Sequence, residues 1–287
     1  GGSSGGGEGS LSPESGGSSG GGEGSLSPES GGSETAESGS GTESLAPEQE
    51  GEEGALSGGA EGGPAIMPMS IPWGADSIIV ETYAEFADAL SNNNGYNTIY
   101  LGADISGDYS GAPNILIDAS KRNVVIDGQD PRPGGQRHSY TSRRSSSDTG
   151  SIYIRSADVQ SITFQNIDII GLAYYGICQF NNSSTYAANN FKVTVKNATY
   201  TGPQMFWGAD VILRMEDLEY TSSSGSGTGA LNEVAELRSL ELAGRVNISH
   251  SAASGISSFW FRNGSASSSV ERYIRVEQGA QVDFVTN

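Results

Sequence analysis

Apolar and polar residues alternate in a pattern that recurs along the second half of the chain. The pattern is apolar, x, apolar, x, Asn or Asp, apolar, x, apolar, and it occurs three times without interruption, at residues 162–169, 193–200 and 213–220. Two further copies, residues 240–248 and 274–282, carry extra residues at a glycine. Alternation with a period of two predicts β-strands. Each copy is too small to bury a core alone, so the pattern predicts a stack of two-strand units, a solenoid.

The Asn or Asp in the middle of each copy predicts a corner between two short strands. Asn166, Asn197 and Asp217 occupy this position, and Asn and Asp tolerate left-handed backbone better than other side chains do. Stacked corner amides can also hydrogen-bond along the solenoid, so a structural role is expected for them. A β-sandwich is the alternative, but it requires hairpins, and Asn-Gly or Asp-Gly turns are scarce after residue 95: only Asp127-Gly128 and Asn263-Gly264 occur.

One amphipathic helix is predicted before the strands. Thr82 and Glu85 have the spacing of a capping box, with Thr82 at the N-cap. Tyr83, Phe86 and Leu90 fall on one face, and the sequence Asn-Asn-Asn-Gly at residues 92–95 ends the pattern. We therefore expect a helix of about two and a half turns that caps the solenoid.

The N-terminal part has a different composition. Residues 1–15 recur identically as residues 16–30, and the first 70 residues contain twelve Glu and no Lys, Arg or Asp. Low hydrophobicity with charge of one sign predicts disorder. We expect an acidic, disordered linker over residues 1–65, a Pro-broken apolar docking segment over residues 66–76, and a β-helix domain over residues 77–287. The chain is interpreted as a fragment, truncated at both ends.

Charge and motif content exclude several classes of function. The net charge is −19, which argues against nucleic-acid partners because phosphate binding needs clustered Lys and Arg. The chain has no apolar run long enough to span a membrane and no zinc, P-loop or dinucleotide motif, so no cofactor is expected. The single cysteine, Cys178, lies in an apolar run and bears no motif relation to either histidine, so it is interpreted as a buried hydrophobe.

Five segments, taken in order, resemble a known family. They are IIVETYAEFADAL (residues 78–90), NTIYLGADIS (97–106), NVVIDGQ (123–129), SITFQNIDIIG (161–171) and FKVTVKNATYTG (191–202). Together they resemble the pectate lyase-like adhesive domain of Gram-positive surface proteins, over residues 77–287. The resemblance implies an all-β, right-handed parallel β-helix, an extracellular location and an adhesive or cell-wall-associated role. The insert at residues 130–148 departs from the short turn that the family has there.

Stacking the copies in register aligns their outward side chains. One column is Thr163, Thr194, Arg214, Glu241, Arg275, and the next is Gln165, Lys196, Glu216, Ala243, Glu277. Alternating charges in these columns predict cross-strand pairs, not the carboxylate cluster that a calcium-dependent lyase needs. A third column, Asp168, Thr199, Glu219, would separate its two acids by about 9.6 Å, which suits an inverting hydrolase on distance alone.

Two groups of residues are candidates for ligand binding. Bases concentrate in the insert: Arg132, Arg137, His138, Arg143 and Arg144. They predict capture of an anionic polymer, with a solvated mobile loop as the alternative. Alternation also predicts that Tyr175, Trp207 and Trp260 face outward, where they could stack on sugar rings, with core or end-cap packing as the alternative.

The sequence therefore predicts a non-enzymatic adhesion or binding module of a secreted, wall-associated bacterial protein. The expected ligand is a polysaccharide or another surface glycan or protein. Relatives are often joined to the wall by a sortase motif or a wall-binding module, and since neither occurs in this chain, attachment through regions outside it is expected. A monomer is expected. A polysaccharide-degrading β-helix enzyme and a structural stalk remain the alternatives.

Overall fold

The structure is a computed structural model that describes residues 71–145, 150–154, 159–180, 190–223, 233–251, 257–262 and 271–286. All of these belong to one compact unit, residues 62–287. The linker predicted at residues 1–65 and the first five residues of the predicted docking segment lie outside the described residues.

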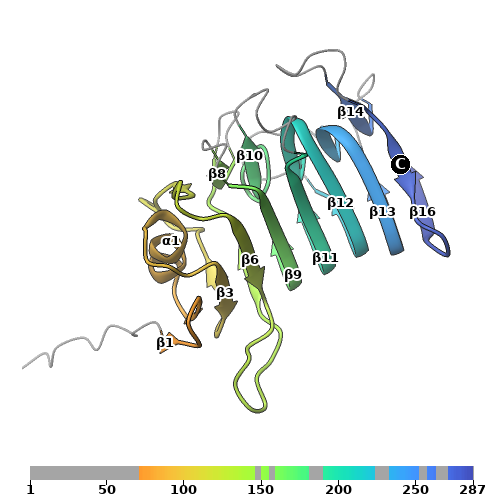
Figure 1. Ribbon diagram of the computed structural model, residues 1–287. Coiled ribbons are helices and arrows are strands. Elements are labelled where there is room, and N and C mark those ends of the chain that lie inside the picture. The colour runs from red at the N-terminus through yellow and green to blue at the C-terminus, as the bar shows by residue number, and fades with distance from the viewer. Residues whose placement is uncertain are drawn as a thin grey trace, which may run out of the picture. The chain divides into compact units, whose positions relative to one another are not determined.

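The predicted helix is confirmed as α1 (Tyr83–Ser91). The Thr82 hydroxyl accepts a hydrogen bond from the Glu85 amide at 3.2 Å, and the Glu85 carboxylate accepts one from the Thr82 amide at 3.0 Å. This reciprocal pair is the predicted capping box. The apolar face of α1 is buried against β2 (Ser77–Val80), β4 (Ile105–Ser106) and β5 (Ile115–Leu116) at the N-terminal end of the fold (Figure 1).

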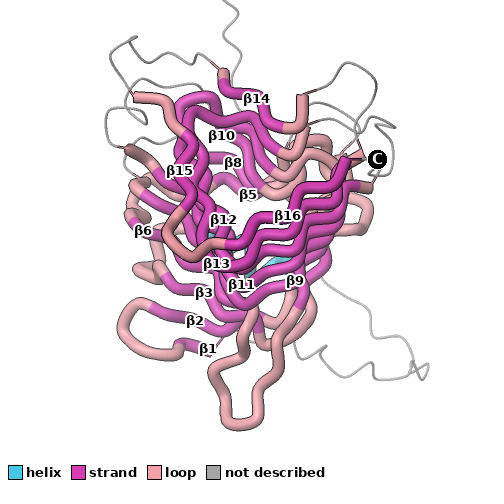
Figure 2. The backbone as a smooth tube through the Cα atoms, turned by 90° about the vertical axis from the view of Figure 1, so that its right-hand side faces the viewer, coloured by secondary structure: helices cyan, strands magenta, loops and turns pink. Residues whose placement is uncertain are grey.

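The strands stack in parallel on three faces of a solenoid (Figures 1 and 2). Four long strands turn the corners and contribute to more than one face: β9 (Ser161–Ile170), β11 (Lys192–Gly202), β12 (Phe206–Ser222) and β13 (Ala235–His250). Within the described residues, every pairing between strands is parallel except that of β1 (Ile71–Pro72) with β2. The predicted parallel β-helix is therefore confirmed. The alternative fold, a β-sandwich, is excluded because it needs antiparallel hairpins.

Shorter strands complete the three faces. The first face contains β2, β3 (Thr98–Leu101), β6 (Asn123–Asp127), the beginnings of β9 and β11, the middle parts of β12 and β13, and β15 (Ile274–Val276). The second face contains β4, β7 (Ser139–Thr141), the ends of the four long strands, and β16 (Gln281–Thr286). The third face contains β5, β8 (Ile152–Ile154), β10 (Cys178–Phe180), the beginnings of β12 and β13, and β14 (Phe259–Phe261).

The core consists of inward columns that run along the solenoid. Phe164 pairs with Val195, and Val195 pairs with Met215, as the repeat alignment predicts. All three side chains are fully buried. Cys178 is also buried on the third face as a free thiol, and burial raises the pKa of that thiol. It packs as the small hydrophobe that the sequence predicts.

The first and second faces meet at the predicted corner. Asn166, Asn197 and Asp217 have φ angles of 51°, 45° and 50°, which is the left-handed region that the Asn or Asp pattern predicts. In the next coil the corner contains one extra residue: Gly244, with φ 59°, and Arg245 together lie opposite Asp217. The inserted residue predicted at this glycine is therefore a β-bulge.

Candidate functional site

The arginines of the insert are held by the body of the protein. The insert leaves the sheet after β6 and projects as a hairpin (Figure 1), with Gln129 opposite Arg137 in an antiparallel bridge. Arg132 donates to Glu81 at 2.8 Å, to Asp130 at 2.9 Å and to the Gly102 carbonyl at 3.0 Å. The bonds to Glu81 and Gly102 fasten the base of the hairpin to the ends of β2 and β3.

The other three arginines are engaged in the same way. Arg137 donates to Asp168 at 2.6 Å and to the Ile167 carbonyl at 2.8 Å, and Arg144 makes a two-pronged contact with Asp108 at 2.7 and 2.8 Å. Arg143 donates to the Ala112 carbonyl at 2.8 Å and to Asn114 at 2.7 Å. Three of the four arginines are thus paired with a carboxylate. Their predicted role in anion capture stays a prediction, and the geometry gives them a structural role.

The first face carries the predicted charge columns. Thr163, Thr194, Arg214, Glu241 and Arg275 are consecutive partners in the register. Lys196 lies 3.1 Å from Glu216, and Glu241 lies 3.6 Å from both Arg214 and Arg275. The alternating columns are therefore confirmed, and the charges pair across neighbouring strands as predicted.

Three carboxylates nevertheless converge on Arg214, an arrangement that the column alignment did not predict. Glu216 lies 2.7 Å from Arg214 and Glu241 lies 3.6 Å away, and Glu277 reaches the same guanidinium from the last coil. Hydrogen bonds from Arg214 lower the pKa of Glu216 and that of Glu277. Burial would raise the pKa of Glu241, but hydrogen bonds from Lys192 and Tyr273 outweigh it and lower that pKa. The three acids are therefore held ionised, whereas a general acid needs a raised pKa.

Among the residues that the structure describes, no group of His, Cys, Asp and Glu side chains could hold a metal ion. Within the same residues, no helix is both long and apolar enough to cross a bilayer.

The third face gathers the three predicted aromatic residues on its outer side. Phe206 is fully buried while its neighbour Trp207 faces out, and Trp260 is 47% exposed between Phe259 and Phe261, which pack against the core. The register places Trp207, Glu236 and Trp260 on consecutive strands. The ring centroids of Tyr175 and Trp207 are 5.7 Å apart. We call the surface formed by Tyr175, Trp207, Trp260 and Arg262 the aromatic ledge.

Arg262 links the two tryptophans of the aromatic ledge. Its guanidinium carbon lies 5.8 Å from the centre of the Trp207 ring and 4.7 Å from that of Trp260. Arg262 also donates to Glu236 at 2.7 Å, and the other oxygen of Glu236 accepts from Gln204 at 3.2 Å. Neither Arg262 nor Glu236 was predicted as a site residue from the sequence. Arg262 directly follows the Phe-Trp-Phe cluster, but only the stacking of the coils brings it over a tryptophan from two coils earlier.

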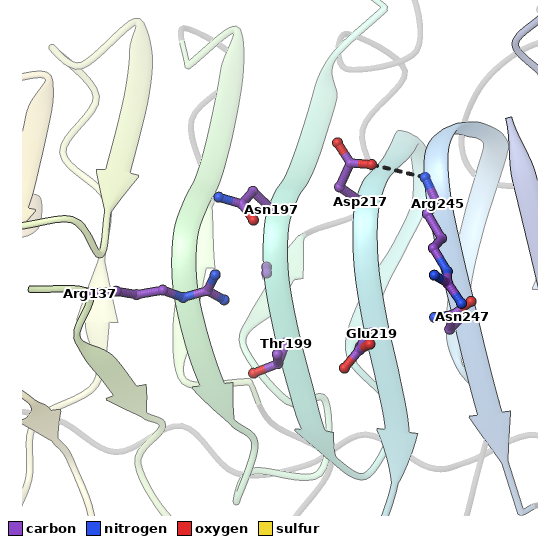
Figure 3. Close-up of a pocket in the computed structure, with 8 residues that line it drawn as sticks. Arg137, Asn197, Thr199, Asp217, Glu219, Arg245 and Asn247 are labelled. Atoms are coloured by element: carbon purple, nitrogen blue, oxygen red, sulfur yellow. Dashed lines mark hydrogen bonds between the residues drawn. The ribbon is translucent and has the colours of Figure 1, made fainter. Parts of the chain in front are cut away.

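A groove lies at the corner between the first and second faces. We call it the corner groove; it has a volume of about 350 Å³. Its lining residues lie on β11, β12 and β13, except for Arg137, which reaches in from the insert (Figure 3). They are Arg137, Asn197, Ala198, Thr199, Asp217, Glu219, Arg245 and Asn247.

The predicted column Asp168, Thr199, Glu219 is confirmed by the register. One carboxylate oxygen of Asp168 is already hydrogen-bonded: Oδ1 accepts from Arg137 at 2.6 Å and from the Thr199 hydroxyl at 2.7 Å. Glu219 lines the corner groove. Asp168 is therefore ion-paired with Arg137, and Thr199 stands between the two acids in the register.

Comparison with known proteins identifies a family for the first part of the fold. Residues 77–207 match the model of a family described as "Putative pectate lyase-like adhesive domain". The resemblance inferred from the sequence is confirmed over these residues; the later coils, which carry Glu236, Trp260 and Arg262, lie beyond the matched segment. No curated protein and no solved structure matches the chain.

Proposed function

From the premise that residues 77–207 form a pectate lyase-like adhesive domain, we propose that this protein is an extracellular adhesion module that holds a glycan chain on the aromatic ledge. The proposed action is binding without cleavage. The domain works at the bacterial surface, with its attachment to the wall supplied by regions outside this chain.

The observation that carries the proposal is the spacing of Trp207 and Trp260 on one face. They are two strands apart in the register, or about 9.6 Å at the usual strand spacing. Aromatic rings present a flat apolar surface, and parallel stacking repeats that surface along the axis of the solenoid. A polysaccharide laid along this axis would meet Trp207 first and Trp260 two coils later.

The surroundings of the rings support a polar, extended ligand. One nitrogen of Arg262 donates to Glu236, and the side chain is 33% exposed. The other N–H groups of its guanidinium hydrogen-bond to no described residue, so they are available to sugar hydroxyls. Tyr175 widens the apolar surface beside Trp207. Buried aromatic and Arg anchors are the residues that usually carry binding energy at interfaces.

A glycan array probed with the full chain tests the proposal. The wild-type protein binds one or more polysaccharides, and Trp207→Ala and Trp260→Ala each lower the affinity at least about tenfold, since each removes a large stacking surface. Trp73→Ala is the matched control, because Trp73 is an exposed tryptophan that lies outside the third face. Trp207→Phe keeps a ring and retains most of the binding, because the indole N–H of Trp207 has no hydrogen-bond partner among the described residues.

Two results would overturn the proposal. One is wild-type binding by Trp207→Ala and Trp260→Ala, which would move the glycan to another surface. The other is an array without any bound glycan, which would favour a protein partner or the structural stalk.

A second candidate function, cleavage of the bound glycan, is favoured by one observation. Glu233 lies just before β13, and its pKa is raised, first by burial and then by the charge of Glu236. A glycosidase uses a carboxylic acid with a raised pKa as its general acid. The test for cleavage is to incubate the bound polysaccharide with wild-type protein and with Glu233→Gln and to measure new reducing ends. Reducing ends that the wild type produces and the variant does not would support cleavage. A polymer that stays intact with the wild type excludes cleavage.

A further inference from the structure

We propose that the corner groove is a second binding site, separate from the aromatic ledge, and that it takes a neutral polyhydroxylated ligand such as a single sugar residue. The site is built by β11, β12 and β13 together with Arg137 of the insert. At about 350 Å³, the groove is at the small end of the range of ligand pockets.

Some polar groups of the corner groove are already used by the fold. Arg137 bonds to Asp168 and to the Ile167 carbonyl. The Thr199 hydroxyl donates to Asp168, and the Asn197 amide donates to Asn166. One oxygen of Asp217 accepts the backbone N–H of Arg245 at 2.9 Å (Figure 3). These bonds hold the walls of the groove in place.

Other groups of the corner groove have no partner among the described residues. The Glu219 carboxylate and the Arg245 guanidinium make no hydrogen bond or ion pair there, although both line the groove (Figure 3). Arg137 Nε and Asn247 Oδ1 are buried polar atoms without a hydrogen-bond partner. A buried unpaired donor or acceptor costs free energy, so a site that leaves two of them beside two unpaired charges is suited to a ligand that supplies the missing partners.

The charges of the groove select the class of ligand. Arg137 and Arg245 oppose a cation, while Asp217 and Glu219 oppose an anion, so a ligand with a net charge of either sign meets repulsion as well as attraction. A hydroxyl group both donates and accepts. Adjacent sugar hydroxyls can therefore donate to Glu219 and accept from Arg245 in the same pose. No aromatic ring of the described residues lines this groove, so recognition here rests on hydrogen bonds and differs from stacking on the aromatic ledge.

Nuclear magnetic resonance titration of the full chain tests the site. The probes are the neutral methyl glycosides of glucose, galactose, mannose and N-acetylglucosamine, compared with methyl glucuronide as an anion, methyl glucosaminide as a cation and glycine as a zwitterion. At least one neutral glycoside is expected to shift the backbone amides of residues 197–199, 217–219 and 245–247. Glu219→Gln and Arg245→Gln each weaken this binding at least about tenfold, which is the usual worth of a hydrogen bond to a charged group.

Matched controls separate the corner groove from general effects and from the ledge. Glu271→Gln and Arg275→Gln remove the same charges at exposed positions outside the groove and leave the titration unchanged. Trp207→Ala and Trp260→Ala also leave the titration unchanged. The experiment therefore distinguishes a failure of the proposed glycan binding on the aromatic ledge from a failure of the proposed sugar binding in the corner groove. The proposal is overturned if no glycoside shifts these amides, if a charged probe or glycine binds more tightly than every neutral glycoside, or if the ledge variants abolish the shifts.

Discussion

The side-chain amide of Asn197 donates a hydrogen bond to the side-chain oxygen of Asn166, one coil earlier, at 2.9 Å. Asn166 in turn donates to Asp127 at 3.0 Å. The two asparagines also share a left-handed backbone, with φ angles of 45° and 51°. One residue type thus satisfies two needs of the corner: a backbone conformation that most side chains avoid, and a polar link between coils.

Replacing Asn197 by Leu is expected to lower the free energy of unfolding by roughly 2–3 kcal/mol. The branched side chain adds about 1–2 kcal/mol of strain at positive φ, and the lost hydrogen bond adds about 1 kcal/mol. Urea denaturation followed by circular dichroism measures the change. Asn197→Gly relieves the strain but not the lost bond, so its loss is smaller. Glycan binding on the aromatic ledge stays at the wild-type level; unchanged stability with lost ledge binding would contradict the structural role of Asn197.

Replacing Thr82 by Ala is expected to destabilise the protein by about 1 kcal/mol, because the Glu85 amide loses its capping acceptor. Thr82→Ser keeps the hydroxyl and serves as the control. Both are compared by urea denaturation. Equal losses in the two variants would show that the methyl group of Thr82, rather than the cap, stabilises α1.

The stability of the protein is expected to fall in acid partly through Glu241. Lys192, Arg214, Tyr273 and Arg275 surround this carboxylate, and its pKa lies below the ordinary value of 4.5 despite burial. Because the folded state binds the proton less tightly than the unfolded state does, the contribution of Glu241 is complete above pH 4.5 and is lost as the pH falls through the lowered pKa.

Melting temperatures of the wild type and of Glu241→Gln, measured across that pH range, check this contribution. Above the ordinary pKa of Glu, the melting temperature of Glu241→Gln is lower than that of the wild type. The difference between the two melting temperatures narrows as the pH falls. A constant difference at every pH would mean that the ionisation of Glu241 contributes nothing and that only its packing does.

Arg262 and Glu236 are expected to be energetically coupled. Glu236 is almost fully buried, and Arg262 is its cationic partner at 2.7 Å. Arg262→Gln leaves the carboxylate without this partner, while Glu236→Gln leaves the guanidinium with its tryptophan contacts alone. A double-mutant cycle by urea denaturation is expected to give a coupling of about 0.5–3 kcal/mol, with the double variant more stable than the two single losses predict. Additive losses would show that the two residues act independently.

Several features were predictable because they depend on local or periodic sequence. The capping box of Thr82 and Glu85 spans four residues, and the corner at Asn197 follows from the backbone preference of one residue type. The columns that contain Glu241 and Lys196 were predictable because each copy alternates with a period of two ahead of the corner, so that aligning the sequences also aligns the strands.

The chain by itself thus determined the parallel solenoid, its helical cap and the outward direction of Trp207 and Trp260. Tertiary structure decided which outward residues meet. The strands of the third face that contain no corner, such as β8, β10 and β14, are three residues long, too short for a periodic signal to set their register. Only the stacking of coils could place Arg262 over Trp207 and bring Glu277 to Arg214, because each of these contacts joins residues that are distant in the sequence. The same stacking lines one groove with Glu219 and Arg245, whose charged groups have no partner among the described residues.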